Sequence, residues 1–232
     1  MGRSSLTTVN ASPREASDQN SRERDWWLRA LAIFQSPRPV FAALRNDSDE
    51  EVDARQEPVL ALILLGGLAG VLLAPSTGTL LDEALVDNSL AVVAVVLFFS
   101  GAIYGGATYW IGGAALLAGL KGAGSRGSYR RARHMLAFAA APLVLGLVLV
   151  WPVRLAVYGS DVFRTGGSDE GAGPAVFEGV LALFAAWAAG LLLYGISVVE
   201  RWSLGRAAVS LALTLLTIVI VTLPFLIPLA SR

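Results

Sequence analysis

Four arginines lie in one short segment, between residues 121 and 134, and their side chains could bind anions. They are Arg126, Arg130, Arg131 and Arg133. A guanidinium group pairs well with phosphate oxygens, and a basic residue near an anionic membrane surface contributes about 1 kcal/mol to binding. We therefore expect this segment to contact anionic lipid headgroups or a cytoplasmic partner. The alternative is that these arginines only set the orientation of the neighbouring membrane helices.

Two adjacent tryptophans, Trp26 and Trp27, form a second candidate contact. Further apolar residues follow them, and Arg38 and Arg45 lie close by in the sequence. Paired tryptophans with apolar bulk and arginines are typical of a short helix in the headgroup region. The same residues could instead cover the cytoplasmic face of a helix bundle, and the two interpretations are compatible.

Residue types that support catalysis are scarce. The chain has no cysteine and a single histidine, His134, which excludes thiolate chemistry, paired-histidine metal sites and Ser-His-Asp triads. We expect no catalytic residue, no metal site and no cofactor, and therefore a protein that is not an enzyme. Arg154 and Glu178, at the ends of two apolar stretches, could form an ion pair; otherwise each side chain reaches water separately.

The composition predicts the elements that position these residues. Hydrophobic residues make up 55% of the 232 residues, 24 more are glycine, and only 16% are charged, against about 25% charged in a soluble domain. Five runs without charge are long enough to be membrane spans, each of which needs about 20 residues. The runs are residues 58–74, 90–120, 135–153, 179–199 and 207–230.

We therefore expect an all-α integral membrane protein, a bundle of five transmembrane helices over residues 58–230. Residues 1–24 are polar, and we expect a disordered tail there. Residues 25–57 should contain the short interfacial amphipathic helix, followed by an acidic linker over residues 47–53 that looks solvated.

The basic residues indicate how the bundle is oriented. With five spans and a cytoplasmic N-terminus, 15 basic residues fall inside and 3 outside, as the positive-inside rule requires. Splitting the long run at residues 90–120 into two spans would move the arginine-rich segment to the outer side. We therefore expect one long second span, a cytoplasmic N-terminus and a C-terminus outside.

Small residues on the first two spans predict where helices approach closely. In lipid, helices associate through close backbone packing, which glycines four residues apart permit. The glycines that we expect in such contacts are Gly66, Gly70, Gly101, Gly105 and Gly112.

Two segments resemble the YIP-domain family, the Ypt/Rab-interacting membrane proteins and their prokaryotic relatives. One runs from Ser128 to Pro142 and the other from Ser36 to Leu44. Within them Pro37, Phe41, Tyr129 and Pro142 occupy recognisable family positions, and the resemblance extends over roughly residues 33–229.

The resemblance implies a helical membrane bundle without known catalytic residues. Eukaryotic members of the family act in vesicle traffic and bind prenylated small GTPases. In this chain 17 of the 18 basic residues are arginine, a composition that indicates a prokaryotic source and argues against a GTPase partner. The resemblance thus implies a multi-pass protein of a prokaryotic plasma membrane.

Two functions are compatible with these features. The first is a non-enzymatic membrane-organising or interaction protein, with lipids and either a second copy or another membrane protein as partners. The alternative is a small-solute or ion permease, which glycine pairs and proline-kinked helices would suit. Nucleic acid is not an expected partner, because the formal net charge is zero and supplies no basic field.

Overall fold

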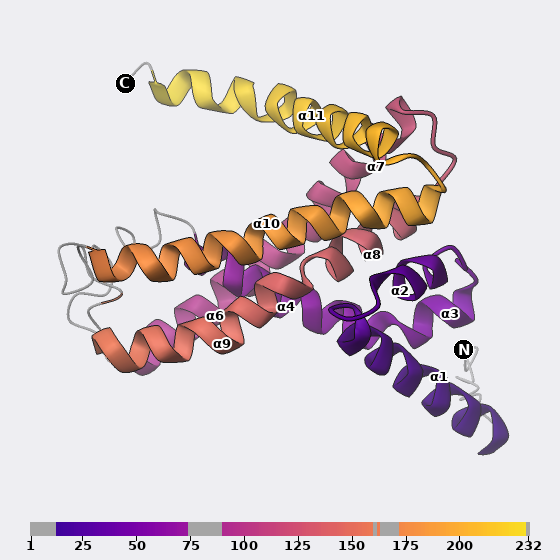
Figure 1. Ribbon diagram of the computed structural model, residues 1–232, viewed down its shortest axis with the longest axis horizontal. Helices are drawn as coiled ribbons and strands as arrows, with labels where there is room; N and C mark the ends of the chain where they lie inside the picture. The colour runs from indigo at the N-terminus through magenta and orange to yellow at the C-terminus, as the bar shows by residue number, and fades with distance from the viewer. Residues whose placement is uncertain (1–12, 74–89, 160–161, 163–171, 231–232) are drawn as a thin grey trace, which may run out of the picture.

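The structure, a computed structural model, describes residues 13–73, 90–159, 162 and 172–230 (Figure 1). All the regular structure in these ranges is helical. Among the described residues, five helices are long and apolar enough to cross a membrane, so the predicted set of five spans is confirmed. They cover Gln56–Leu73, Ala91–Gly122, Tyr129–Tyr158, Ala175–Glu200 and Leu204–Leu223.

The second span is one long helical stretch, as expected. It consists of α6 (Leu90–Ala107), the π-helical turn η1 (Thr108–Gly112) and α7 (Gly113–Gly122). A π turn places one extra residue in the helix without breaking it. The 32-residue candidate span is thus continuous from α6 through the π turn to α7.

The third span begins earlier than the apolar run predicts and contains a break. It consists of α8 (Tyr129–Ala139) and α9 (Ala141–Tyr158). Ser128 begins α8, since its hydroxyl accepts a 3.1 Å hydrogen bond from the backbone N–H of Arg131. The two helices are separated at Ala140, because Pro142 has no N–H to continue the backbone ladder.

The remaining spans are α4 (Gln56–Leu73), α10 (Ala172–Glu200) and α11 (Leu204–Ala230). Helix α4 packs along α6, α9 along α10, and α11 along α7. In Figure 1, α10 and α11 lie close together where they meet and diverge towards the C-terminus.

Three further helices precede the first span, and we call them the cap. They are α1 (Pro13–Ala32), α2 (Pro37–Ala43) and α3 (Asp49–Ala54), and they lie together at one end of the bundle (Figure 1). Helix α1 starts at Pro13, inside the segment that we expected to be disordered. The segment allows this, because proline is tolerated in a first helical turn and charged residues such as Arg14 and Glu15 have good helix propensity.

Polar contacts join the cap to two connections between spans. Arg131 donates to the carbonyl of Arg45 at 3.0 Å, and Arg45 donates to the carbonyl of Val199 at 3.3 Å at the end of α10. Arg206 donates to the carbonyl of Ala123 at 2.7 Å, which joins the first turn of α11 to the α7–α8 loop. The three segments that the positive-inside rule groups together therefore lie at one end of the bundle.

Candidate functional site

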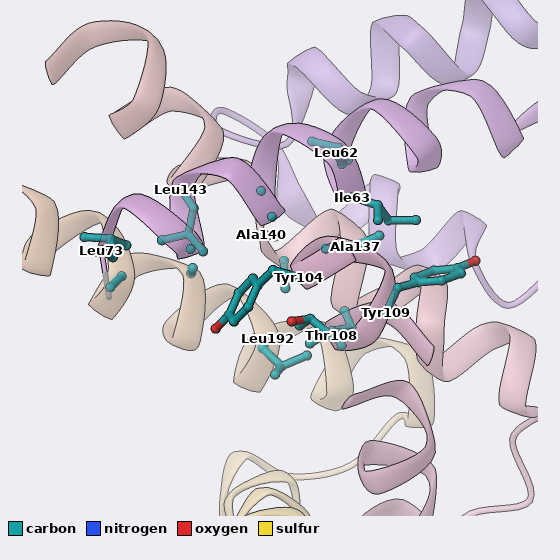
Figure 2. Close-up of a pocket in the computed structure, with 18 of the residues that line it drawn as sticks. Leu62, Ile63, Leu73, Tyr104, Thr108, Tyr109, Ala137, Ala140, Leu143 and Leu192 are labelled. Atoms are coloured by element: carbon teal, nitrogen blue, oxygen red, sulfur yellow. The ribbon is translucent and has the colours of Figure 1, made fainter. Parts of the chain in front are cut away.

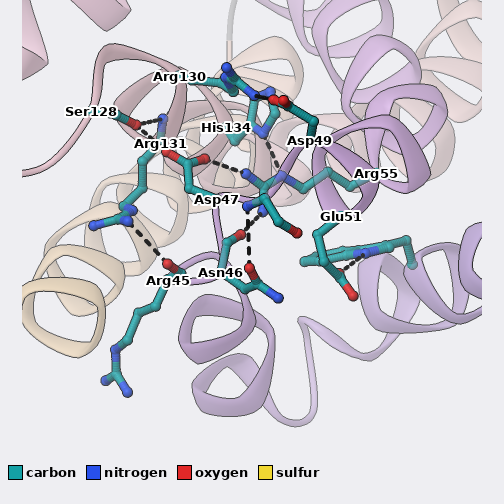
Figure 3. Close-up of polar contacts among 12 residues, drawn as sticks. Arg45, Asn46, Asp47, Asp49, Glu51, Arg55, Ser128, Arg130, Arg131 and His134 are labelled. Carbon is teal, nitrogen blue, oxygen red and sulfur yellow. Dashed lines mark hydrogen bonds and ion pairs between the residues drawn. The ribbon is translucent and has the colours of Figure 1, made fainter.

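A buried arginine lies at the centre of the contacts between the cap and the bundle. Arg55 is fully buried, and it donates three hydrogen bonds (Figure 3). Its Nε–H reaches Nδ1 of His134 at 2.7 Å, and its two terminal nitrogens reach the carbonyl of Asn46 at 2.8 Å and Oδ1 of Asp47 at 2.9 Å. The planar guanidinium thus joins the segment before α3 to α8.

Asp47 completes this network from the other side. Its Oδ2 accepts a hydrogen bond from the hydroxyl of Ser128, the residue that begins α8 (Figure 3). Burial alone would raise the pKa of the Asp47 carboxyl, but the Ser128 hydrogen bond and the charges of Arg55, Arg131 and Arg130 together hold that pKa below its usual range. The carboxylate is therefore the stable form in the folded protein.

The local sequence explains how Arg55 comes to be buried. It follows the last residue of the short helix α3 and immediately precedes α4, and a cation at a helix C-terminus is favourable. Burial lowers the pKa of the guanidinium, an effect that the charge of Asp47 opposes. Arginine stays charged in such surroundings, and its charge is compensated inside the network.

Acids of the predicted acidic linker make contacts within the protein, although the Asp49 side chain stays 88% exposed to solvent. Asp49 pairs with Arg130 at 2.8 Å, and Glu51 accepts a 3.0 Å hydrogen bond from the indole N–H of Trp26. With Asp47 bound to Arg55, three of its acids have partners in the cap or on α8. The partners of Asp49 and Glu51 lie far away in the chain, so the local sequence does not indicate these contacts.

Three of the four arginines expected to contact lipid are used within the protein. Arg130 pairs with Asp49, and Arg131 binds the carbonyl of Arg45. The Arg133 guanidinium carbon lies 3.9 Å from the ring centre of Trp110 and within 5 Å of those of Tyr109 and Tyr129. The remaining one, Arg126, is exposed on the α7–α8 loop.

The paired tryptophans separate in the structure. Trp26 is buried, with its ring centre 5.8 Å from that of Phe138 on α8, so it packs between the cap and the bundle, as the second of the two interpretations expects. Its indole N–H is satisfied by Glu51, which makes this burial favourable. Trp27 is 40% exposed and donates a 3.3 Å hydrogen bond to Glu57.

The glycines of the first two spans lie where α4 and α6 approach. A Cβ added at Gly101 would lie 2.8 Å from the Cα of Leu68, and one added at Gly70 would collide with the Tyr104 ring. One added at Gly105 would collide with the carbonyl of Ile63. These positions therefore need glycine for the observed helix contact.

The other two predicted packing glycines have more room. An added Cβ at Gly66 would lie at an ordinary 3.4 Å from the Cβ of Ala140, and one at Gly112 would lie 3.1 Å from Leu136.

Two glycines that we did not predict, Gly67 and Gly119, have less room for an added Cβ. A Cβ at Gly67 would lie 2.5 Å from the Cα of Gly105, and one at Gly119 would lie 2.7 Å from the backbone N of Thr214 on α11.

An apolar groove of about 440 Å³ lies between α4, α6, α8–α9 and α10 (Figure 2). Glycine, alanine and leucine side chains line most of it, and Tyr104, Thr108 and Tyr109 are the residues of its lining that carry hydroxyl groups. Figure 2 shows the Tyr104 side chain lying across this region between the ribbons. A lining of this kind suits hydrocarbon better than a hydrated ion.

The remaining predicted pair, Arg154–Glu178, stays a prediction. Arg154 is buried with its guanidinium carbon 5.2 Å from the ring centre of Trp151, whereas Glu178 is exposed. The described ranges contain no cluster of three or more acidic or histidine side chains that could hold a metal ion.

Fold and site together define a class: a helical multi-pass membrane protein with an N-terminal cap locked onto the bundle. The family model of the Yip1 domain matches residues 9–226, nearly the whole chain, and the chain therefore belongs to the Yip1 family. This match confirms the resemblance seen in the segments around Phe41 and Tyr129. No match is found among curated proteins, and none among solved structures.

Proposed function

We propose that this protein is a non-enzymatic membrane-organising protein whose capped end faces the cytoplasm of a prokaryotic cell. The supporting observation is the buried Arg55 network, which joins the segments on both sides of α3 to α8 at the end of the bundle. The capped end of the bundle carries exposed basic residues, such as Arg38 on α2 and Arg201 after α10, and is suited to holding anionic lipid headgroups or a cytoplasmic partner.

The interior of the described spans favours this role over transport. The buried hydroxyls of Ser210 and Thr214 donate to carbonyls of their own helix at 2.8 and 2.9 Å, so they offer no free donor to a solute. The groove between α4 and α10 is lined mainly by apolar side chains. A permease needs polar groups along a path through the midplane, and these residues do not supply one.

The test combines flux with lipid retention. The protein is reconstituted into vesicles of phosphatidylcholine and phosphatidylglycerol loaded with an ion-sensitive dye, and the lipids that remain bound after detergent purification are identified. We expect no flux above that of empty vesicles, together with enrichment of phosphatidylglycerol over its share in the membrane. Saturable flux, or bound lipid of unchanged composition, would contradict the proposal.

A further inference from the structure

A second hollow, of about 470 Å³, lies where α2 meets the end of α10. It is separate from the Arg55 network and from the apolar groove. Three arginines line it: Arg38 on α2, Arg45 just after α2, and Arg201 just after α10. The packing of Phe41 against Gly195 joins the two helices beside it, since a Cβ added at Gly195 would lie 2.5 Å from the Phe41 ring.

The charge of this hollow is uncompensated. Arg45 is held in place by the carbonyls of Val198 and Val199, which are neutral acceptors. Among the described residues, no carboxylate forms an ion pair with Arg38, Arg45 or Arg201. The acid closest in sequence, Glu200, instead accepts a 2.7 Å hydrogen bond from Ser125 of the α7–α8 loop.

The backbone at Arg201 favours a functional role for its side chain. Arg201 has a φ of 57°, in the left-handed region, and the N–H of Trp202 bonds to the carbonyl of Ser197 at 3.0 Å. This is the helix ending at which glycine is the usual residue, because a Cβ there is strained. Backbone strain of this kind concentrates at functional positions, which favours a role for the Arg201 side chain.

The hollow also lies at the right depth to meet lipid headgroups. The candidate fourth span ends at Glu200, the residue before Arg201. Tyr194 and Trp202 lie in the lining, and tyrosine and tryptophan are enriched at the boundary between hydrocarbon and water. Arg206 covers Trp202, with its guanidinium carbon 4.1 Å from the ring centre.

We infer that Arg38, Arg45 and Arg201 form a binding site for a phosphate group carried by an anionic lipid headgroup or by a small soluble phosphate. Guanidinium groups present paired N–H donors that match phosphate oxygens, and three of them converge here. This inference deepens the proposed function, on which it rests for the contact between the capped end and an anionic membrane.

The test uses a variant that removes the side chain without stressing the backbone. Arg201→Gly places the residue preferred at this helix ending, so the variant is expected to unfold at the same or a higher temperature than the wild type. Arg126→Gly on the α7–α8 loop is the matched control, since it removes the same charge from an exposed position at the same end. Binding of phosphatidylglycerol is measured for all three proteins by native mass spectrometry, with phosphatidylcholine as the competing lipid.

We expect Arg201→Gly to weaken phosphatidylglycerol binding by about tenfold or more, as the loss of charge-assisted hydrogen bonds predicts, and Arg126→Gly to leave it within about twofold. A second arm adds inorganic phosphate or glycerol phosphate. If these bind the wild type but not Arg201→Gly and displace the lipid, the source is a soluble phosphate; if they do not displace it, the source is the headgroup.

Three results would overturn the site. The first is unchanged lipid and phosphate binding in Arg201→Gly. The second is an equal loss of binding in Arg201→Gly and Arg126→Gly, because equal losses indicate diffuse surface charge; this result leaves the proposed function standing. A wild-type protein with no preference for phosphatidylglycerol and no binding of either soluble phosphate would contradict both the site and the proposed function.

Discussion

Arg55 donates its Nε–H to Nδ1 of His134 over 2.7 Å, although the two residues are 79 positions apart in the chain. Arg55 precedes the first span and His134 lies on α8, so the bond connects the cap to the third membrane segment. Because Nδ1 accepts this bond, the neutral ring carries its proton on Nε2. The only histidine of the chain is thus a structural acceptor.

Replacing Arg55 should release the cap from the bundle. Arg55→Ala leaves Nδ1 of the buried His134 and Oδ1 of the partly exposed Asp47 without their donor, and a buried acceptor left unsatisfied costs about 1–3 kcal/mol. We expect a lower unfolding temperature and faster amide exchange in α3 and the start of α8. Hydrogen–deuterium exchange in detergent micelles measures both segments directly.

Two further variants make that result specific. Arg55→Lys keeps the charge but lacks the planar fork that reaches three acceptors, so it should rescue little of the lost stability. Arg126→Ala, in the exposed loop, should behave as the wild type. Equal stability of Arg55→Ala and wild type would show that the network does not hold the cap.

Acidification should loosen the cap through Asp47. The pKa of this carboxyl is held below its usual range in the folded protein. Such a group contributes stability above its unfolded pKa of about 4, and that contribution is lost as the pH falls through the folded pKa. The difference in unfolding stability between wild type and Asp47→Asn should therefore be constant from about pH 8 to about pH 5 and shrink below about pH 4.

Thermal unfolding of both proteins across this pH range, followed by ellipticity, checks the prediction. The comparison with Asp47→Asn is needed because other carboxyls also titrate in acid. Their contributions to unfolding stability are the same in both proteins and cancel in the difference. A difference that grows on acidification would have the wrong sign for a carboxyl with a lowered pKa.

The spans were predictable from sequence because a membrane imposes a simple requirement. In hydrocarbon the backbone must satisfy its own hydrogen bonds, so uncharged runs of sufficient length become helices. The ends were less predictable. The third span starts at Tyr129 and not at residue 135, because the polar first turns of α8 are begun by Ser128 and covered by the cap, which sequence hydropathy does not report.

The site was less predictable than the fold for two physical reasons. An arginine facing lipid and one paired with a distant acid look alike in sequence, and Asp49 meets Arg130 across 81 positions. Glycine spacing likewise indicates that α4 has a close-packed face, but not the rotation of the helix about its axis. Gly67 therefore lies at a close contact of α4 that we did not predict, whereas the predicted Gly66 has more room.

A methyl group at Gly67 should separate α4 from α6. The added Cβ would collide with the carbonyl of Gly101 and lie 2.5 Å from the Cα of Gly105, and backbone atoms cannot move aside as flexible side chains do. Overpacking of this kind costs about 1–3 kcal/mol. Thermal unfolding of Gly67→Ala in detergent should show this loss.

Gly106 provides the matched control on the second span. No heavy atom lies within 4 Å of a Cβ added there, and alanine is a better helix former than glycine by about 1 kcal/mol. Gly106→Ala should thus be neutral or stabilising. If Gly67→Ala and Gly106→Ala shift the unfolding temperature in the same direction, the observed α4–α6 contact is wrong.

The Arg133 guanidinium should be coupled energetically to Trp110, since its carbon lies only 3.9 Å from the centre of that ring. Arg133→Met keeps much of the apolar stem while removing the charge, and Trp110→Leu removes the aromatic face. A cation–π contact beside a ring that is half exposed is worth about 0.5–1 kcal/mol. The double-mutant cycle should therefore give a coupling energy in that range in the unfolding equilibrium. Additive effects of the two substitutions would mean that Arg133 is held by packing alone, and the stacking on Trp110 would then contribute no specific stability.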